Sequence, residues 1–128
     1  KLKSEKKIIN IEKTNARYLD DKIIHEKVDL IVCDVSFISM KKVIKPSLIF
    51  LQQNLGVIVA LIKPQFEAKR SDVERRGLVR EPTVHAKVLG HVINWSINSG
   101  FRFLGLVPSP ITGAQGNREF FILIQRPK

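Results

Sequence analysis

The sequence has few of the residues that stabilise small proteins covalently. Its single cysteine, Cys33, excludes an internal disulfide and a metal site built from several cysteines. No apolar run approaches the ~18 residues that a membrane-spanning helix needs, and no signal peptide is visible. Cys33 lies in an apolar run with no basic partner nearby, so we expect a buried core residue and not a catalytic thiol. These absences fit one domain in a reducing cytoplasm.

Acidic residues are also scarce. The 128 residues include 12 Asp and Glu against 22 Lys and Arg, which gives a net charge of +10. Such an excess predicts a nucleic acid partner, because Lys and Arg displace counterions from the phosphate backbone. A basic surface that only faces water is the alternative. The sequence starts at Lys1 without a methionine, so we expect it to begin inside a longer gene product.

Short apolar runs alternate with amphipathic segments, a pattern typical of an α/β sheet. We predict strands at residues 8–11, 28–35, 57–62, 101–107 and 119–124, and helices at 41–51 and from Pro82 to a stop at Gly100. Residues 28–35 are almost continuously apolar, which predicts a parallel strand covered on both faces. The charged segment 66–81 is predicted to be a loop. Only a short loop separates the last two strands, so they should form an antiparallel hairpin.

Three charged residues interrupt apolar strands at their ends. Asp34 ends one predicted strand, Lys63 follows the next, and Glu119 begins the last. Because the last strand is antiparallel, its start should face the same rim as the carboxyl ends of the other two. Each residue alone could be ordinary: a turn cap, a surface lysine, or a partner of Arg118. Together they predict a functional site, since perturbed charged groups cluster at such sites.

Five segments in series resemble the TlyA family of haemolysin-like proteins, whose catalytic domain is related to FtsJ RNA methyltransferases. They are Thr14–Arg17, Asp34–Ser39, Lys63–Glu67, Gly77–His85 and Ser109–Phe120. The resemblance implies a class I (Rossmann-like) methyltransferase sheet ending in an antiparallel hairpin. It also implies S-adenosylmethionine as cofactor and 2′-O-methylation of ribosomal RNA, at cytidine, as the activity of the full-length parent.

The resemblance also implies roles for individual residues. FtsJ enzymes use a Lys-Asp-Lys-Glu tetrad, and Asp34, Lys63 and Glu119 match its last three members. Lys63 would act as the base or stabilise the alkoxide, Asp34 would orient Lys63 and lie near the methionine part of the cofactor, and Glu119 would hold the ribose or the lysine. No metal is needed, because a sulfonium already activates the methyl group. Asn15 would contact the adenine, although it could be an ordinary turn residue.

A cluster of basic side chains occupies the predicted loop. We expect these residues to follow RNA phosphates, with a solvated loop as the alternative. The cluster consists of Lys69, Arg70, Arg75, Arg76 and Arg80. His85 falls in the first turn of the predicted helix and is expected to be structural, because the resemblance already supplies a base.

Parts of the family pattern are missing from the sequence. The glycine-rich loop, the acidic end of the second strand, the first lysine of the tetrad and an S4-like RNA-binding domain have no counterpart in residues 1–128. We therefore predict a partial domain that lacks the first two strands, leaves strand 8–11 without a neighbour, and is inactive alone. A non-enzymatic, basic RNA-binding remnant is the alternative. A membrane-active haemolysin is disfavoured, because no stretch has the length and apolar face for insertion.

Overall fold

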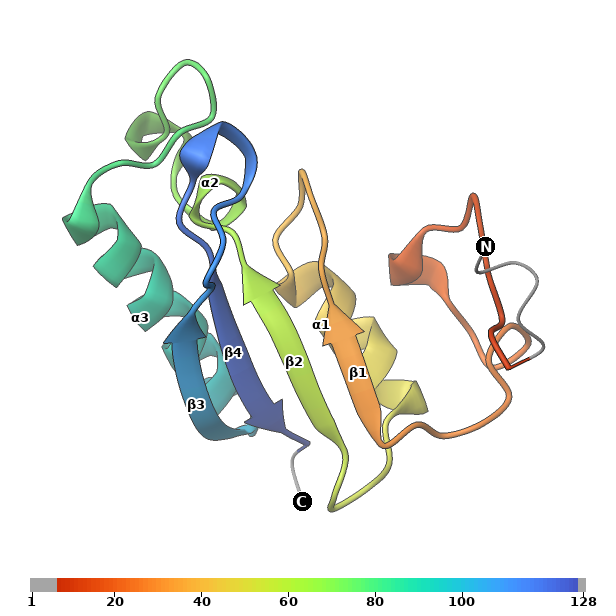
Figure 1. Ribbon diagram of the computed structural model, residues 1–128. Coiled ribbons are helices and arrows are strands. Elements are labelled where there is room, and N and C mark those ends of the chain that lie inside the picture. The colour runs from red at the N-terminus through yellow and green to blue at the C-terminus, as the bar shows by residue number, and fades with distance from the viewer. Residues whose placement is uncertain (1–6, 127–128) are drawn as a thin grey trace.

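The structure, a computed structural model, describes residues 7–126 and contains one four-stranded sheet with the order β1-β2-β4-β3 (Figure 1). The strands are β1 (Leu30–Cys33), β2 (Val57–Ile62), β3 (Arg102–Pro108) and β4 (Phe120–Gln125). Strands β1 and β2 are parallel, whereas β4 runs antiparallel to both β2 and β3. The predicted α/β sheet and its closing antiparallel hairpin are confirmed.

Three α-helices accompany the sheet in the described part of the chain. They are α1 (Lys41–Ser47), α2 (Pro64–Glu67) and α3 (Pro82–Asn98). Helices α1 and α3 cover the same face of the sheet (Figure 1). Helix α3 matches its prediction closely. It starts at Pro82, a residue suited to a first helical turn because it has no N–H to leave unpaired, and the chain leaves it at Gly100, whose φ of 84° favours glycine.

Helix α1 is shorter than predicted. It ends at Ser47, and the chain continues as a 3-10 helix over Leu48–Phe50. Pro46 lies inside this helix, where it cannot donate a hydrogen bond to the preceding turn and crowds the carbonyl group there, so it weakens the helix. The apolar residues of the segment still reach the core, since Ile44 and Leu51 are fully buried.

The core lies between the sheet and these two helices. Alternate residues of β2, namely Ile58, Ala60 and Ile62, are fully buried, as expected for the period of two along a strand. Cross-strand neighbours on β4 and one face of α3 complete the cluster. They include Ile122, Ile124, Val84, Val88 and Val92.

The other face of the sheet is open. Leu30 and Val32 alternate with the core residues of β1, and Val32 is 69% exposed. At the far side of the sheet Val107 is also exposed. In the described part of the chain no helix covers this face (Figure 1). The prediction that strand 28–35 is covered on both faces was therefore wrong, although its residues are apolar as such a strand requires.

Two further predictions need correction. Residues 8–11 form no strand, and Ile9 is largely exposed. Within residues 7–126 no strand lies beside them to complete the backbone hydrogen bonds that a sheet needs. Segment 66–81 is not loop throughout: it contains the end of α2, which Pro64 starts, and a 3-10 helix at Arg70–Asp72.

Burial predicts a specific pH dependence for Cys33. Burial raises the pKa of the thiol from its ordinary 9.0 to about 11, and the nearby carboxylates of Asp34 and Glu67 add to the effect. Between these two pH values the unfolded chain loses the proton and the folded chain keeps it. The free energy of unfolding should therefore fall as pH rises from about 9 to about 11, by roughly 2–3 kcal/mol. Urea unfolding of the wild type and Cys33→Ala across this range checks it. If the free energy of unfolding changes with pH in the same way in both proteins, the prediction for Cys33 is wrong.

Candidate active site

Three charged residues meet at one rim of the sheet. Asp34 directly follows β1, Lys63 directly follows β2, and Glu119 directly precedes the antiparallel β4. All three line one hollow of about 500 Å³. The strand directions therefore bring together the Asp, Lys and Glu that the sequence singled out.

Lys63 is largely enclosed at this rim. Its side chain is 13% exposed, its Nζ lies 2.7 Å from Oδ1 of Asp34, and it donates to Oγ of Ser36 at 3.1 Å. An ammonium group has three N–H donors, so one donor remains for a ligand in the hollow. Asp34 is 63% exposed and also faces solvent. The pair can thus bind a polar ligand and accept a proton from it or donate one to it.

Glu119 is buried, with 8% of the residue exposed. Its Oε1 accepts a hydrogen bond from Nε2 of Gln65 at 3.2 Å. Gly113 lies against the same carboxylate. Sequence reasoning missed both neighbours. Gln65 could have been found, because it lies two residues after Lys63 in the same motif, whereas the approach of Gly113 depends on tertiary structure.

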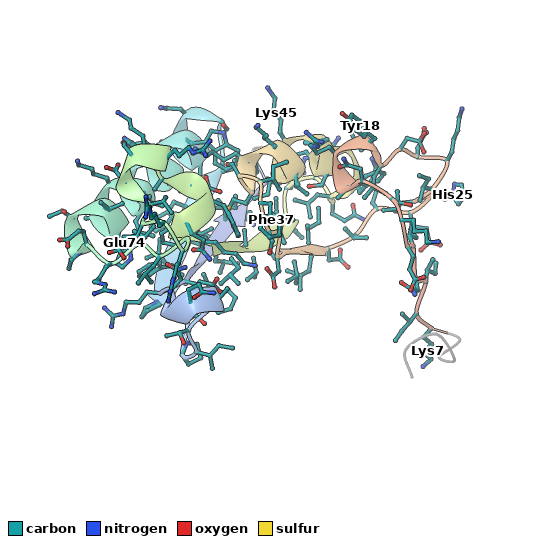
Figure 2. The ribbon with its side chains drawn as sticks, turned by 90° about the horizontal axis from the view of Figure 1, so that it is seen from above. Lys7, Tyr18, His25, Phe37, Lys45 and Glu74 are labelled. Atoms are coloured by element: carbon teal, nitrogen blue, oxygen red, sulfur yellow. The ribbon has the colours of Figure 1, made fainter. Side chains whose placement is uncertain are left out.

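Phe37 was also missed. It is 91% exposed although it lies between Ser36 and the half-buried Ile38, and its φ of 63° is unusual for a bulky residue. Its ring lies 5.2 Å from that of Phe66. Figure 2 views the rim from above and shows Phe37 between the segment that carries Glu74 and the one that carries Tyr18. Residues in such uncommon backbone conformations cluster at functional sites.

Asn15 lies beside this rim and has a local structural role. Its Oδ1 accepts from the backbone N–H of Arg17 at 3.1 Å and so caps the 3-10 helix Ala16–Tyr18. It also lines a second hollow of about 520 Å³, together with Phe37. Ser36 lines both hollows, so the two lie next to each other. The turn role is observed, and the cofactor contact remains a prediction.

A buried carboxylate joins two of the motifs. Glu67 accepts hydrogen bonds from the backbone N–H of Met40 and from Oγ of Ser39, both at 2.8 Å. Glu67 belongs to the Lys63 segment and Ser39 to the Asp34 segment. The contact therefore fixes the two segments that carry the Asp34–Lys63 pair relative to each other.

The basic cluster lies on the segment between α2 and α3. Its side chains are exposed, and within it Arg80 lies 3.6 Å from Glu74. Asn117 anchors this segment: its Oδ1 accepts from the N–H of Val79, and its Nδ2 donates to the carbonyl of Gly77. Because Asn117 is close to Glu119 in sequence, the anchor brings residues 77–80, which include Arg80, near the rim of the hollow. The cluster comprises Lys69, Arg70, Arg75, Arg76 and Arg80.

His85 is buried, as a structural role requires. Its Nε2 lies 2.9 Å from the carbonyl of Val79, and its ring meets Phe120 edge-on. It thus ties the start of α3 to the segment that carries the basic cluster.

Comparison with known proteins links this arrangement to one family. The FtsJ-like methyltransferase family matches residues 1–126. Hemolysin A of Brachyspira hyodysenteriae is 39% identical over 121 residues, which is 94% of this chain and 50% of that protein. The 16S/23S rRNA (cytidine-2′-O)-methyltransferase TlyA of Mycobacterium tuberculosis is 35% identical over 124 residues, 97% of this chain and 46% of that protein. The chain thus spans about half the length of these relatives.

A solved structure shows the same fold. A candidate hemolysin from Streptococcus thermophilus superposes with a TM-score of 0.92 at 34% identity, over 99% of this chain and 46% of the other. No helix in residues 7–126 has the length and hydropathy needed to cross a membrane.

Proposed function

Because the chain belongs to the FtsJ-like methyltransferase family, we propose that it carries the catalytic rim of a ribosomal RNA 2′-O-methyltransferase that acts on cytidine. The observation that carries the proposal is the enclosed Lys63 amine, 2.7 Å from Asp34 and in the same hollow as Glu119. The excess of positive charge suits an RNA substrate. Such a substrate implies a cytoplasmic enzyme.

The proposed chemistry centres on a proton. A ribose 2′-hydroxyl is a poor nucleophile and must lose its proton as it attacks a methyl group. The amine of Lys63 would take that proton, or in its charged form would donate to the oxygen and stabilise the negative charge that develops there. Asp34 holds the amine in place through the 2.7 Å contact. Glu119 would receive a hydrogen bond from the ribose.

The residues at the rim suit one part of a cofactor site. We propose that Asp34 and Asn15 contact S-adenosylmethionine, because the two hollows that they line meet at Ser36 and the exposed carboxylate of Asp34 suits a cationic ligand. When bound, this cofactor would supply an activated methyl group. The sequence contains no glycine-rich loop to receive the rest of it.

The open face of the sheet supports a larger domain. Apolar residues of β1 and β3 face solvent there, which is unusual for a sheet with parallel strands. The relatives are about twice as long as this chain. We therefore propose that residues 1–128 form part of a methyltransferase domain whose other part packs on this face, and we call the longer protein the complete enzyme.

This incompleteness gives a prediction for cofactor binding. The isolated chain should bind S-adenosylmethionine weakly or not at all by calorimetry, since it offers only part of a site. The complete enzyme should bind it at least about 100-fold more tightly, a difference of about 2.7 kcal/mol. Equal affinities would contradict the proposal of a partial domain.

Phe37 gives a prediction for RNA. An exposed aromatic ring beside the hollow offers a surface on which an unstacked base can stack. Replacing Phe37 with alanine in the complete enzyme should raise KM for ribosomal RNA about 10-fold, since stacking on one aromatic ring is worth roughly 1–3 kcal/mol. Phe37→Tyr keeps the ring and should behave as the wild type. Steady-state kinetics measure both, and an unchanged KM in Phe37→Ala would rule out stacking.

The proposed function is tested by methyl transfer itself. The complete enzyme, labelled S-adenosylmethionine and ribosomal RNA should give labelled RNA, and Asp34→Ala should remove the activity. If the complete enzyme binds RNA but transfers no methyl group, the alternative holds: a non-enzymatic, basic RNA-binding protein, which the net charge of +10 would suit.

A further inference from the structure

We infer that Gln65 and Gly113 are positioning residues that fix the carboxylate of Glu119. The inference rests on the proposed function, in which Glu119 contacts the ribose. It starts from two contacts at the same atom: Oε1 of Glu119 accepts from Nε2 of Gln65 at 3.2 Å and lies directly against Gly113.

Gly113 is required for space and not for backbone conformation. Its φ of −83° and ψ of −163° are available to any residue. A Cβ added there would lie 2.0 Å from Oε1 of Glu119 and 2.4 Å from Cδ. Carbon and oxygen atoms cannot approach so closely, so a side chain at this position and the observed carboxylate exclude each other.

The hydrogen-bond partners of Gln65 define the orientation of its side-chain amide. Its Oε1 is buried and has no hydrogen-bond partner among residues 7–126. An unsatisfied buried carbonyl costs about 1–3 kcal/mol. Turning the amide over would not help, because it would place that oxygen against the carboxylate of Glu119. The observed orientation is therefore the one that gives Glu119 a donor, and this hydrogen bond accounts for the unsatisfied oxygen of Gln65.

The two contacts leave the second oxygen of Glu119 free for a ligand. Oε2 accepts no hydrogen bond from residues 7–126 and is not among their buried unsatisfied atoms, so it keeps access to the hollow. With Oε1 held by Gln65 and confined by Gly113, Oε2 has a fixed direction. This fixed direction lets Glu119 accept a hydrogen bond from a ribose hydroxyl placed beside Lys63.

The first test uses this chain alone. A crystal structure of the Gly113→Ala chain should show the Glu119 carboxylate turned away from Gln65, with the fold otherwise unchanged. A carboxylate that stays beside Gln65 would overturn the role of Gly113. This readout does not depend on methyltransferase activity.

The second test uses single-turnover methyl transfer by the complete enzyme. Gly113→Ala and Gln65→Leu should each lower the rate at least about 10-fold, which corresponds to about 1.4 kcal/mol in the barrier, while KM for RNA changes less than about 2-fold. Gln65→Leu also removes the unsatisfied oxygen, so its melting temperature should not fall by more than about 4 °C. Gly90→Ala is the matched control, since a Cβ at Gly90 meets nothing within 4 Å and the rate should not change.

A double-mutant cycle separates positioning from a general structural effect. In the Glu119→Ala background, neither Gly113→Ala nor Gln65→Leu should reduce the remaining rate further, because both act through Glu119. Additive losses, or wild-type rates in the single variants, would overturn this inference but leave the proposed function standing. A complete enzyme with no activity at all would instead overturn the proposed function, and the inference with it.

Discussion

Lys63→Arg in the complete enzyme should lower the single-turnover rate of methyl transfer by at least about 100-fold, the usual contribution of a positioned proton acceptor. Arginine keeps the positive charge and the ability to donate to Asp34, which lies 2.7 Å from the lysine amine. It cannot take a proton, because a guanidinium has a pKa above about 12. Donor and RNA binding should therefore persist while transfer is lost.

Controls separate this loss from a loss of charge or of folding. Lys63→Ala should be similarly inactive. Lys45→Arg makes the same exchange at an exposed position on α1, outside the hollow, and should have the wild-type rate (Figure 2). Rates are measured at saturating donor over a range of pH. Near-normal turnover by Lys63→Arg would refute proton transfer by Lys63 and leave it only an electrostatic role.

RNA binding by this chain alone should decrease strongly with salt. If the basic cluster of Lys69, Arg70, Arg75, Arg76 and Arg80 neutralises about five phosphates, each contributes about −0.7 to −0.9 to the slope of log affinity against log salt. Affinity for structured RNA should then fall at least about 100-fold between roughly 50 and 200 mM salt. Fluorescence anisotropy with labelled RNA measures the slope.

A pair of variants tests whether the cluster is responsible. Arg75→Ala should reduce the magnitude of the slope by about one contact and weaken binding. Arg102→Ala removes the same charge at the start of β3, at the opposite end of the sheet from the rim, and should change the slope little. Equal effects of the two variants would show that the overall charge attracts RNA and that the cluster is an ordinary solvated segment.

The sequence was sufficient to predict the sheet and the convergence at its rim. The apolar runs that became β2 and β4 are nearly continuous, and the short connection before β4 permits only an antiparallel return. Once the strand directions are known, residues that follow β1 and β2 and precede β4 must lie at one edge. The proximity of Asp34, Lys63 and Glu119 therefore follows from strand polarity alone.

Other features depend on which segments pack against each other in the folded chain. Local sequence patterns do not encode these tertiary contacts. The apolar pattern of residues 28–35 predicted a strand buried on both faces, whereas Val32 faces solvent. Burial depends on the segments that pack against a strand, and not on the residues of the strand alone. For the same reason residues 8–11, apolar but without a neighbour among the described strands, do not form one. Gly113 was missed because its partner, Glu119, approaches only in the folded chain.

The position of the transferred methyl group is the most direct test of ribose chemistry at this rim. Ribosomal RNA treated with the complete enzyme and labelled S-adenosylmethionine is digested to nucleosides, which are separated and identified by mass spectrometry. We expect label on the 2′ oxygen of cytidine, and none when Lys63 is replaced by arginine. Label on a base, or full labelling by Lys63→Arg, would contradict the assignment of ribose chemistry to the Asp34–Lys63–Glu119 rim.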